Sequence, residues 1–160
     1  MNVRISVVLA LAAAAALIGC GPPNYIVMTE DMAPALEQGD IVAIDSGAYE
    51  EASPERGDIV SYHAPDEPKG KALMGRVVAL AGETVSVKDG ALQVDGEPVE
   101  APWAGEEMPF ETDAVQVPGA HVYILGDNRE EARDSHVFGP VPVESIVGKI
   151  TDVQKAPEPQ

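Results

Sequence analysis

Short apolar runs separated by glycine- and proline-rich turns recur along the chain after residue 24. Several runs alternate apolar and polar positions with the period of two typical of β-strands, and no segment after residue 20 keeps a helical period. We expect strands at Tyr25–Met28, Ile41–Ile44, Ile59–Tyr62, Leu73–Leu80, Thr84–Lys88, Ala91–Val94, Glu97–Val99, His121–Leu125 and Ser145–Val153. The pattern predicts an all-β fold, a sandwich or partly open barrel of short strands.

The residues between these runs predict tight turns and one long loop. Asp89-Gly90 is a typical two-residue hairpin turn, and Asp95-Gly96 repeats the signal one strand later. Residues 100–117 contain five acidic residues, two prolines and the chain's one tryptophan. We expect this stretch to be a surface loop, with Trp103 and Phe110 packed against a sheet.

The N-terminus has the pattern of an export signal. Arg4 precedes an apolar run, Ile5–Ile18, that is shorter than the roughly 20 residues of a membrane-spanning helix. Leu17-Ile18-Gly19-Cys20 reads as a lipobox, in which the cysteine thiol carries diacylglycerol, and Cys20 is the chain's single cysteine. We predict a lipoprotein signal peptide at residues 1–19 and a lipidated tether at 20–24. The alternative is an uncleaved anchor that buries Cys20.

The rest of the chain predicts one domain at residues 25–153 and a disordered tail at 154–160. The net charge of −17, from 27 acidic and 10 basic residues, repels nucleic-acid phosphates and anionic lipid headgroups. We therefore expect no nucleic-acid partner, and a membrane link only through lipid on Cys20. The three histidines are scattered without ligand spacing, so we expect no metal and no other cofactor.

Seven short boxes follow one another in a fixed order. They are Met28–Leu36, Gly39–Val42, Arg56–Val60, Gly75–Val85, Gly126–Ser135, Phe138–Val141 and Ile146–Lys149. Their order and spacing resemble those of the type I signal peptidases, or leader peptidases. In that family the first box is close to Ser-x-Ser-Met-x-Pro-Thr-Leu and the fourth begins with Lys-Arg-Val. The resemblance implies a mostly antiparallel β fold and a serine endopeptidase that processes exported precursors.

The resemblance also implies a serine nucleophile with a lysine base. Desolvation keeps a buried lysine neutral, so that it can take the serine's proton, while hydroxyl and amide donors hold the oxyanion. Three of the matching positions differ here: Asp31 stands for the nucleophile, Gly75 for the lysine and Ala132 for a serine that orients the lysine. Thr29 matches the oxyanion-hole hydroxyl. Since glycine accepts no proton and Asp31 is anionic, we expect the catalytic positions to be non-functional.

Other residues offer weaker routes to catalysis. Lys71 precedes Gly75 by four residues, about 13 Å along an extended strand, which is too far for direct replacement. Lys149 lies in the closing strand, where a structural role is the simpler interpretation. Asp31 paired with Asp127 or Asp134 would imitate an aspartic dyad, although nothing in the spacing requires it.

The box at residues 126–135 keeps most of its polar residues. Asp127, Asn128, Arg129 and Asp134, with Ala132 among them, are expected to brace the former site through turns and buried ion pairs. In a functional interpretation the family's groove survives and binds an extended peptide by strand addition. Small residues at Gly75 and Ala132 would leave that groove more open.

Three functions remain open at this point. The first is a lipid-anchored, signal-peptidase-like protein without peptidase activity, which binds extended peptides or exported proteins, or serves as a scaffold, on the extracytoplasmic side of a bacterial envelope. The second is a working serine endopeptidase with displaced catalytic groups. The third is a purely structural lipoprotein. Peptide binding separates the first from the third, and turnover separates the first from the second.

Overall fold

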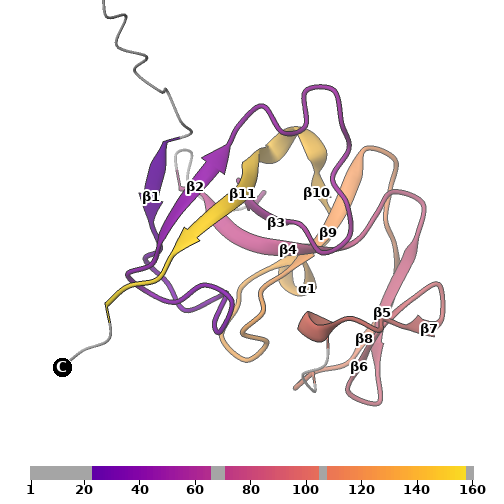
Figure 1. Ribbon diagram of the computed structural model, residues 1–160. Coiled ribbons are helices and arrows are strands. Elements are labelled where there is room, and N and C mark those ends of the chain that lie inside the picture. The colour runs from indigo at the N-terminus through magenta and orange to yellow at the C-terminus, as the bar shows by residue number, and fades with distance from the viewer. Residues whose placement is uncertain (1–22, 66–70, 105–107, 158–160) are drawn as a thin grey trace, which may run out of the picture.

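The computed structural model describes residues 23–65, 71–104 and 108–157, and its strands form one large and one small sheet (Figure 1). The large sheet has the order β1-β2-β11-β3-β4-β9-β10 and the small sheet has the order β7-β6-β5-β8. The strands are β1 Asn24–Ile26, β2 Ile41–Asp45, β3 Ile59–Tyr62, β4 Leu73–Ala79, β5 Thr84–Lys88, β6 Ala91–Val94, β7 Glu97–Pro98, β8 Thr112–Gln116, β9 His121–Leu125, β10 Val141–Pro142 and β11 Ile146–Gln154. The described pairs are antiparallel, which confirms the predicted fold class.

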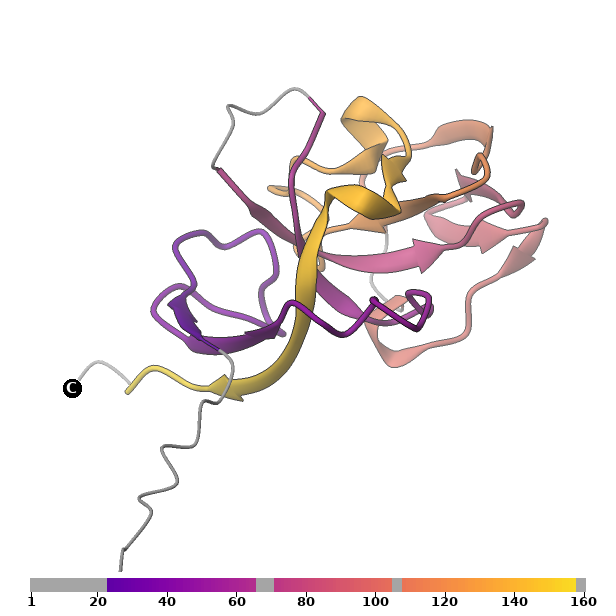
Figure 2. The ribbon, with the colours of Figure 1, turned by 90° about the horizontal axis from the view of Figure 1, so that it is seen from above.

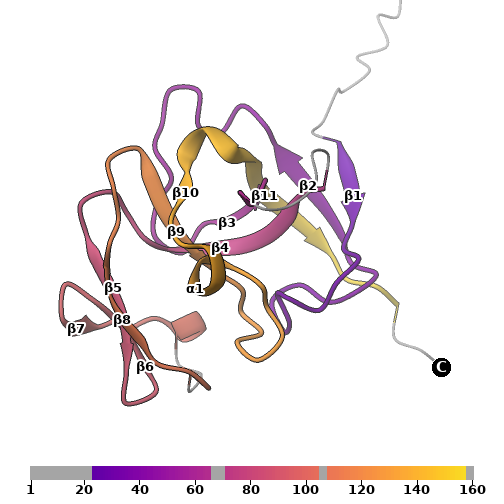
Figure 3. The same cartoon turned by 180° about the vertical axis from the view of Figure 1, so that it is seen from behind.

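The predicted hairpin turns form as the sequence indicates. Asp89 and Gly90 join β5 to β6 with φ of 51° and 72°, and Asp95 and Gly96 join β6 to β7 with φ of 53° and 83°. Positive φ at both central residues matches the twist of the flanking strands, which is why Asp-Gly is favoured there. Figures 1 and 3 show the small sheet set to one side of the large one.

The predicted loop at residues 100–117 is wrong in part. It contains a 3-10 helix, η1 (Pro102–Ala104), and the strand β8, which pairs with β5 at Val85 and Val115. β8 lies at the edge of its sheet and its residues are exposed or only half-buried, so its sequence shows no alternation of apolar and polar positions. Trp103 and Phe110 do pack against the core between the two sheets, as predicted.

Further short elements were also missed. They are α1 (Ser135–Phe138), η2 (Val143–Ser145) and the two-residue strand β10. Each is too short for a periodic pattern to register. Figure 2 shows β11 running from η2 across the molecule to the C-terminal end, so the closing strand joins both halves of the large sheet.

The C-terminal segment differs from the predicted disordered tail at residues 154–160. Gln154 belongs to β11, Lys155 Nζ donates to Asp40 Oδ2 at 2.9 Å, and the Ala156 amide donates to Asp40 Oδ1 at 2.9 Å. Asp40 is fully buried, and such a carboxylate needs donors from elsewhere in the chain. Residues 158–160, like the predicted signal peptide and Cys20, lie outside the described residues.

Three apolar clusters fill the interior, and β4 passes between them. Leu73 and Val77 face the cluster around Val60, Tyr62 and Ile124. Met74 faces the opposite cluster, which includes Val27, Met32, Leu36, Val42, Ile44 and Ile150. β4 and the segment that follows β1 are therefore joined through one core. Among the described residues, no helix is long and apolar enough to cross a membrane.

Candidate functional site

The loop between β1 and β2 places Asp31 against the turn after β9. Met32, which follows Asp31, is buried in the core and fixes the loop from within. The backbone amide of Asn128 donates to the carbonyl of Asp31 at 3.1 Å, and Asn128 Nδ2 donates to the carbonyl of Glu30 at 3.2 Å. The box at residues 126–135 thus holds the backbone of the first box, and Asp31 remains half-buried.

The hydroxyl expected at the oxyanion position already has an acceptor. Thr29 Oγ1 donates to Asp31 Oδ2 at 2.9 Å. A hydroxyl has one proton to donate, so Thr29 cannot serve a developing oxyanion while it holds this bond. A carboxylate beside that position would also repel the negative charge of the oxyanion.

Gly75 lies in β4 opposite Val60, and its surroundings contradict the predicted open groove. A Cβ built on Gly75 would collide with Cγ2 of Ile124 and would lie 3.2 Å from Cε1 of Tyr62. Both neighbours are fully buried. The place of the family's lysine side chain is therefore filled from the two neighbouring strands of the same sheet, β9 and β3, because an apolar interior packs to high density around a missing side chain.

Ala132 is equally enclosed. A Cβ built on Gly126 would collide with the Ala132 side chain and would lie 2.5 Å from the carbonyl oxygen of Asp31. The glycine allows three segments to meet, namely the end of β9, the turn with Ala132 and the loop with Asp31. The expectation that Ala132 opens the groove is also wrong, since its methyl group is buried in this contact.

Asp127 forms a buried ion pair with Arg76, the residue after Gly75. Arg76 Nε and a terminal guanidinium nitrogen donate to the two carboxylate oxygens at 2.8 and 2.6 Å, and the other terminal nitrogen donates to the Gly57 carbonyl at 2.8 Å. The guanidinium carbon lies 5.5 Å from the centre of the Trp103 ring. This two-pronged pair ties β4 to the turn after β9.

Asp134 joins the end of β9 to α1. One carboxylate oxygen accepts from the Gly126 amide at 2.8 Å, and the other accepts from the backbone amide and Nδ1 of His136 at 2.9 and 2.7 Å. It is the N-cap of α1, and the next residue, Ser135, accepts the Ile124 amide at 3.0 Å. Figure 3 shows α1 beneath β4 and β9. The guanidinium of Arg129, in the same turn, donates to the Trp103 carbonyl at 3.3 Å.

Tyr62 is a site residue that the sequence analysis missed. It is fully buried on β3, and within the part of the chain that the structure describes its hydroxyl has no hydrogen-bond partner. Burial raises the pKa of the phenol, and the nearby carboxylates of Asp134 and Asp31 raise it further. Tyr62 and Ile124 look like ordinary strand residues in the sequence, so no sequence signal pointed to either.

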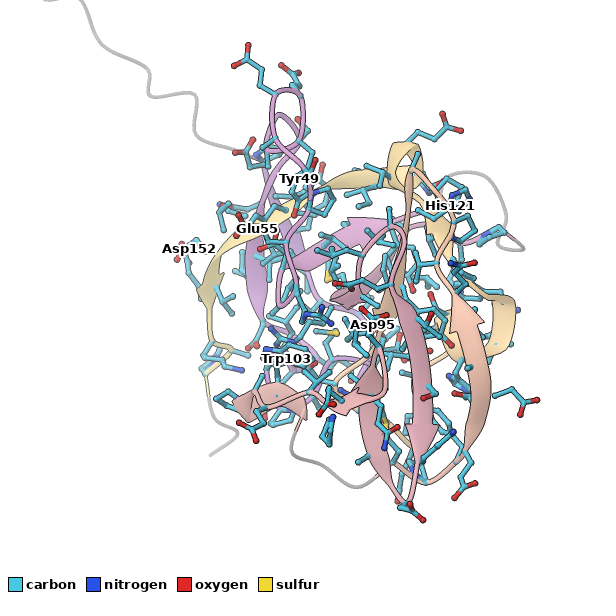
Figure 4. The ribbon with its side chains drawn as sticks, turned by 90° about the vertical axis from the view of Figure 1, so that its right-hand side faces the viewer. Tyr49, Glu55, Asp95, Trp103, His121 and Asp152 are labelled. Atoms are coloured by element: carbon cyan, nitrogen blue, oxygen red, sulfur yellow. The ribbon has the colours of Figure 1, made fainter. Side chains whose placement is uncertain are left out.

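The other lysines weighed as replacements for the base lie elsewhere. Lys149 Nζ contacts Asp58 Oδ1 at 2.6 Å, and Asp58 also accepts from the Tyr49 hydroxyl and the Glu55 amide, which come from the loop labelled in Figure 4. Burial raises the pKa of Asp58, but these three donors outweigh it and leave the pKa lowered. Lys71 is exposed.

An aspartic dyad with Asp31 does not form, because Asp127 and Asp134 direct their carboxylates at Arg76 and at the cap of α1.

Three surface hollows also lie apart from Asp31 and Gly75. Two border the small sheet near Asp89 and Glu111, and one of about 410 Å³ lies near Leu80 and His121, the latter labelled in Figure 4. The described residues contain no cluster of histidine, cysteine or acidic side chains that could hold a metal ion.

Comparison with known proteins agrees with this architecture. A protein from Synechocystis named "Probable signal peptidase I-1" is 37% identical over 132 residues, 79% of this chain and 67% of the relative. Signal peptidase I of Leptolyngbya laminosa is 33% identical over 127 residues, and thylakoidal processing peptidase 1 of Arabidopsis thaliana is 37% identical over 127 residues. The match to the Leptolyngbya protein covers 76% of this chain and 63% of the relative. The match to the Arabidopsis protein covers 74% of this chain and 37% of the relative.

A solved structure and a family model lead to the same group. The crystal structure of a signal peptidase I from Enterococcus faecalis V583 matches with a TM-score of 0.54 and 26% identity, over 62% of this chain and 97% of that chain. The model of the family described as signal peptidase, peptidase S26, matches residues 1–153. The predicted resemblance is therefore confirmed, and the chain belongs to the signal peptidase S26 family.

Proposed function

We propose that this chain is a lipid-anchored member of the S26 family that binds extended peptides at the membrane surface without cleaving them. The observation that carries the loss of cleavage is the packing at Gly75. Ile124 and Tyr62 occupy the space into which a lysine side chain would project. A general base must lie within hydrogen-bond reach of the nucleophile, and no side chain can extend from this position.

The other parts of the reaction are altered in the same direction. Asp31 has no hydroxyl to attack a carbonyl, and its carboxylate accepts a hydrogen bond of 2.9 Å from the Thr29 hydroxyl. In serine-type cleavage the nucleophile and base act as one unit, so removing either already costs most of the rate, and the oxyanion donors make a separate contribution. Here all three are changed, which supports a site that no longer cleaves.

The peptide-binding part of the proposal rests on an open strand edge. Among the described residues, Leu73, Met74 and Gly75 pair with β3 on one side, while pairing of β4 with β9 begins only at Arg76. Met74 packs against the same core as Val27 and Met32, so the Asp31 loop lies over the face of β4 that carries the Met74 side chain. An extended peptide laid along the edge would add a strand and satisfy the backbone groups there.

The relatives support one part of the proposal, namely that the chain acts at an envelope membrane. The lipid anchor is a further step. Several relatives carry the name signal peptidase I, and their processing of exported chains would take place at a membrane. Cys20 at the end of the lipobox supports a lipid as the anchor on the extracytoplasmic side. Cys20→Ala should release the expressed protein from the membrane fraction and remove a diacylglyceryl mass shift. Retention with no such shift would contradict the lipid anchor.

Turnover is the first experiment. Purified residues 21–160 and the signal peptidase I of Bacillus caldolyticus, a relative 31% identical over 144 residues, would be incubated with the same signal-bearing precursor. We expect cleavage by the relative and none by this chain. Cleavage by this chain that Asp31→Ala abolishes would overturn the proposal.

Binding is the second experiment. A labelled extended hexapeptide should bind residues 21–160 and shift the amide NMR signals of Leu73 and Met74. The matched control is the same peptide with alternate backbone amides N-methylated, which removes the donors that strand addition needs. Failure of both peptides to bind would leave the structural lipoprotein as the better function.

A second candidate is an active endopeptidase with displaced catalytic groups. This candidate is favoured by the names of the relatives, such as signal peptidase I of Leptolyngbya laminosa, because those names describe a peptidase. It requires a base from outside the described residues or a change in the packing at Gly75. The turnover experiment separates it from the first function.

A further inference from the structure

Large apolar side chains are exposed together at one end of the large sheet. Among the described residues six large hydrophobic side chains are exposed, and five of them lie on β1, just after it, or on the adjoining strands β2 and β11. They are Tyr25, Ile26, Met28, Ile41 and Val153. Single exposed apolar residues are normal on a protein surface, but a group of them on adjoining strands indicates a surface that contacts something other than water.

Three of these side chains share the outer face of the sheet. Ile26 pairs with Ile41 across β1 and β2, and residues directly opposite each other point to the same side. Val27 is buried and its amide donates to the Asp40 carbonyl, so the extended pairing continues past the end of β1. Ile26 and Met28, on either side of Val27, therefore point away from the core, and they are 59% and 71% exposed. We call the side chains of Ile26, Met28 and Ile41 the β1 face.

The proposed lipid lies within a short reach of this face. The chain takes four residue steps from Cys20 to Asn24, the first residue of β1, and fully extended it spans about 14 Å over that length. The acyl chains on Cys20 would lie in the hydrocarbon region, and the headgroup layer outside that region is only about 5–7 Å deep. A lipid on Cys20 would therefore keep β1 at or close to the membrane surface, whatever path the tether takes.

The charge of the chain favours an apolar contact with lipid over the other uses of this face. A net charge of −17 repels anionic headgroups, and it also opposes the approach of a second copy of the chain. Apolar side chains that leave water for the membrane interface need no opposite charge.

Three such side chains bind a bilayer weakly on their own. A lipid that already holds the domain at the surface raises their effective concentration there, so the two contacts support each other. The β1 face would therefore act together with the lipid on Cys20, and the loss of that lipid would release the protein.

We propose that the β1 face docks onto the bilayer in which the lipid on Cys20 is inserted, and so fixes the orientation of the domain on the membrane. This inference rests on the lipid anchor of the proposed function and adds to it a contact surface and an orientation. Figures 1 and 3 show β1 at one end of the molecule and the small sheet at the other. With β1 in the headgroup layer, the small sheet points away from the membrane.

Quenching of tryptophan fluorescence by brominated lipids tests this orientation. The chain from Cys20 onward would be coupled through its single thiol to a maleimide lipid in phosphatidylcholine vesicles, so that the result does not depend on lipidation in the cell. Met28→Trp adds a reporter to the β1 face, and Ala114→Trp adds a matched reporter to an exposed position of β8 in the small sheet. Wild type, in which Trp103 is the only tryptophan, gives the background.

We expect brominated lipid to reduce the added fluorescence at position 28 by at least about twofold, because an interfacial side chain reaches the acyl boundary, and to leave that at position 114 unchanged. Ile26→Ser with Ile41→Ser should weaken the quenching at position 28. Val137→Ser is the matched control, since it removes an exposed apolar side chain from α1 instead, and it should leave the quenching as it was.

The outcomes separate this inference from the anchor on which it rests. Equal quenching at positions 28 and 114, or no effect of the two serines, would overturn the β1 face while the lipid anchor stands. A dimer of residues 21–160 in sedimentation that the two serines dissociate would assign the face to a second copy, and would overturn the inference as well. If Cys20 of the expressed protein carries no diacylglyceryl group, the anchor fails and this inference fails with it.

Discussion

The two halves of the site differ sharply in what they have kept. The turn from Gly126 to Asp134 retains a full set of polar contacts, since Asp127 holds Arg76 and Asp134 caps α1 and binds the Gly126 amide. The positions that match the family's nucleophile and base carry Asp31 and Gly75, and apolar atoms of Ile124 crowd the position of Gly75. The polar frame of the site is kept, while the two positions that match the family's reactive groups carry other residues.

The difference shows which residues of a catalytic site also hold the fold together. Asp127 and Asp134 are buried, and removing either would leave uncompensated donors in the interior. A nucleophile and a base hold little of the structure, so they can change while the frame stays in place. The same distinction predicts large stability effects in the frame and smaller effects in the centre.

The largest expected effect is in the frame. Asp127→Ala leaves the buried guanidinium of Arg76 without its anion and should lower the free energy of unfolding by about 3–5 kcal/mol. Urea unfolding followed by circular dichroism measures this. The control is Asp113→Ala on β8, an exposed acid for which a change within about 0.5 kcal/mol is expected. If Asp127→Ala lowers the free energy of unfolding by less than about 1 kcal/mol, the polar frame does not hold the fold more strongly than the centre of the site does.

The second effect tests the filled centre. Gly75→Ala should destabilise the fold by about 1–3 kcal/mol, because its methyl group meets Ile124 in a packed core. Gly119→Ala is the control, since nothing lies within 4 Å of a Cβ built there. Gly75→Lys together with Asp31→Ser should remain inactive and less stable than wild type. Equal stability of Gly75→Ala and wild type would show that the position is open after all.

Much of the fold could be predicted from the sequence, and much less of the site. The period-two runs and the Asp-Gly turns act over a few residues, so β5 and β6 were located correctly. The edge strand β8 was missed because its exposed and half-buried residues do not alternate between apolar and polar positions. The filling of Gly75 by Ile124 depends on the pairing of two strands distant in sequence, and no local pattern contains that information.

The third effect concerns the hydroxyl of Tyr62. Tyr62→Phe removes a buried group that has no partner among the described residues, and should stabilise the unliganded protein by about 1 kcal/mol. Tyr49→Phe is the contrasting change, because the Tyr49 hydroxyl donates to Asp58 at 2.8 Å and its removal should destabilise by about 0.5–1.5 kcal/mol. Thermal unfolding of the two variants gives the signs. Destabilisation by both would mean that Tyr62 already has a partner in solution.

The smallest effect is at the C-terminal end, where Asp40 holds the loop that carries Asp31. Hydrogen bonds from the amides of Glu37 and Ala156, together with Lys155, outweigh burial and lower the pKa of Asp40 to about 2. In the unfolded chain the pKa is about 3.9, so the carboxylate stabilises the fold above that pH and loses its contribution as the pH falls through about 2. We expect the difference in Tm between wild type and Asp40→Asn to be present at about pH 6 and to shrink toward about pH 2. Asp152→Asn on the exposed end of β11, labelled in Figure 4, should show no such trend. If the Asp40 difference persists in acid, the C-terminal residues do not hold this loop through charge. The frame of the site would then end at β11 and exclude Lys155 and Ala156.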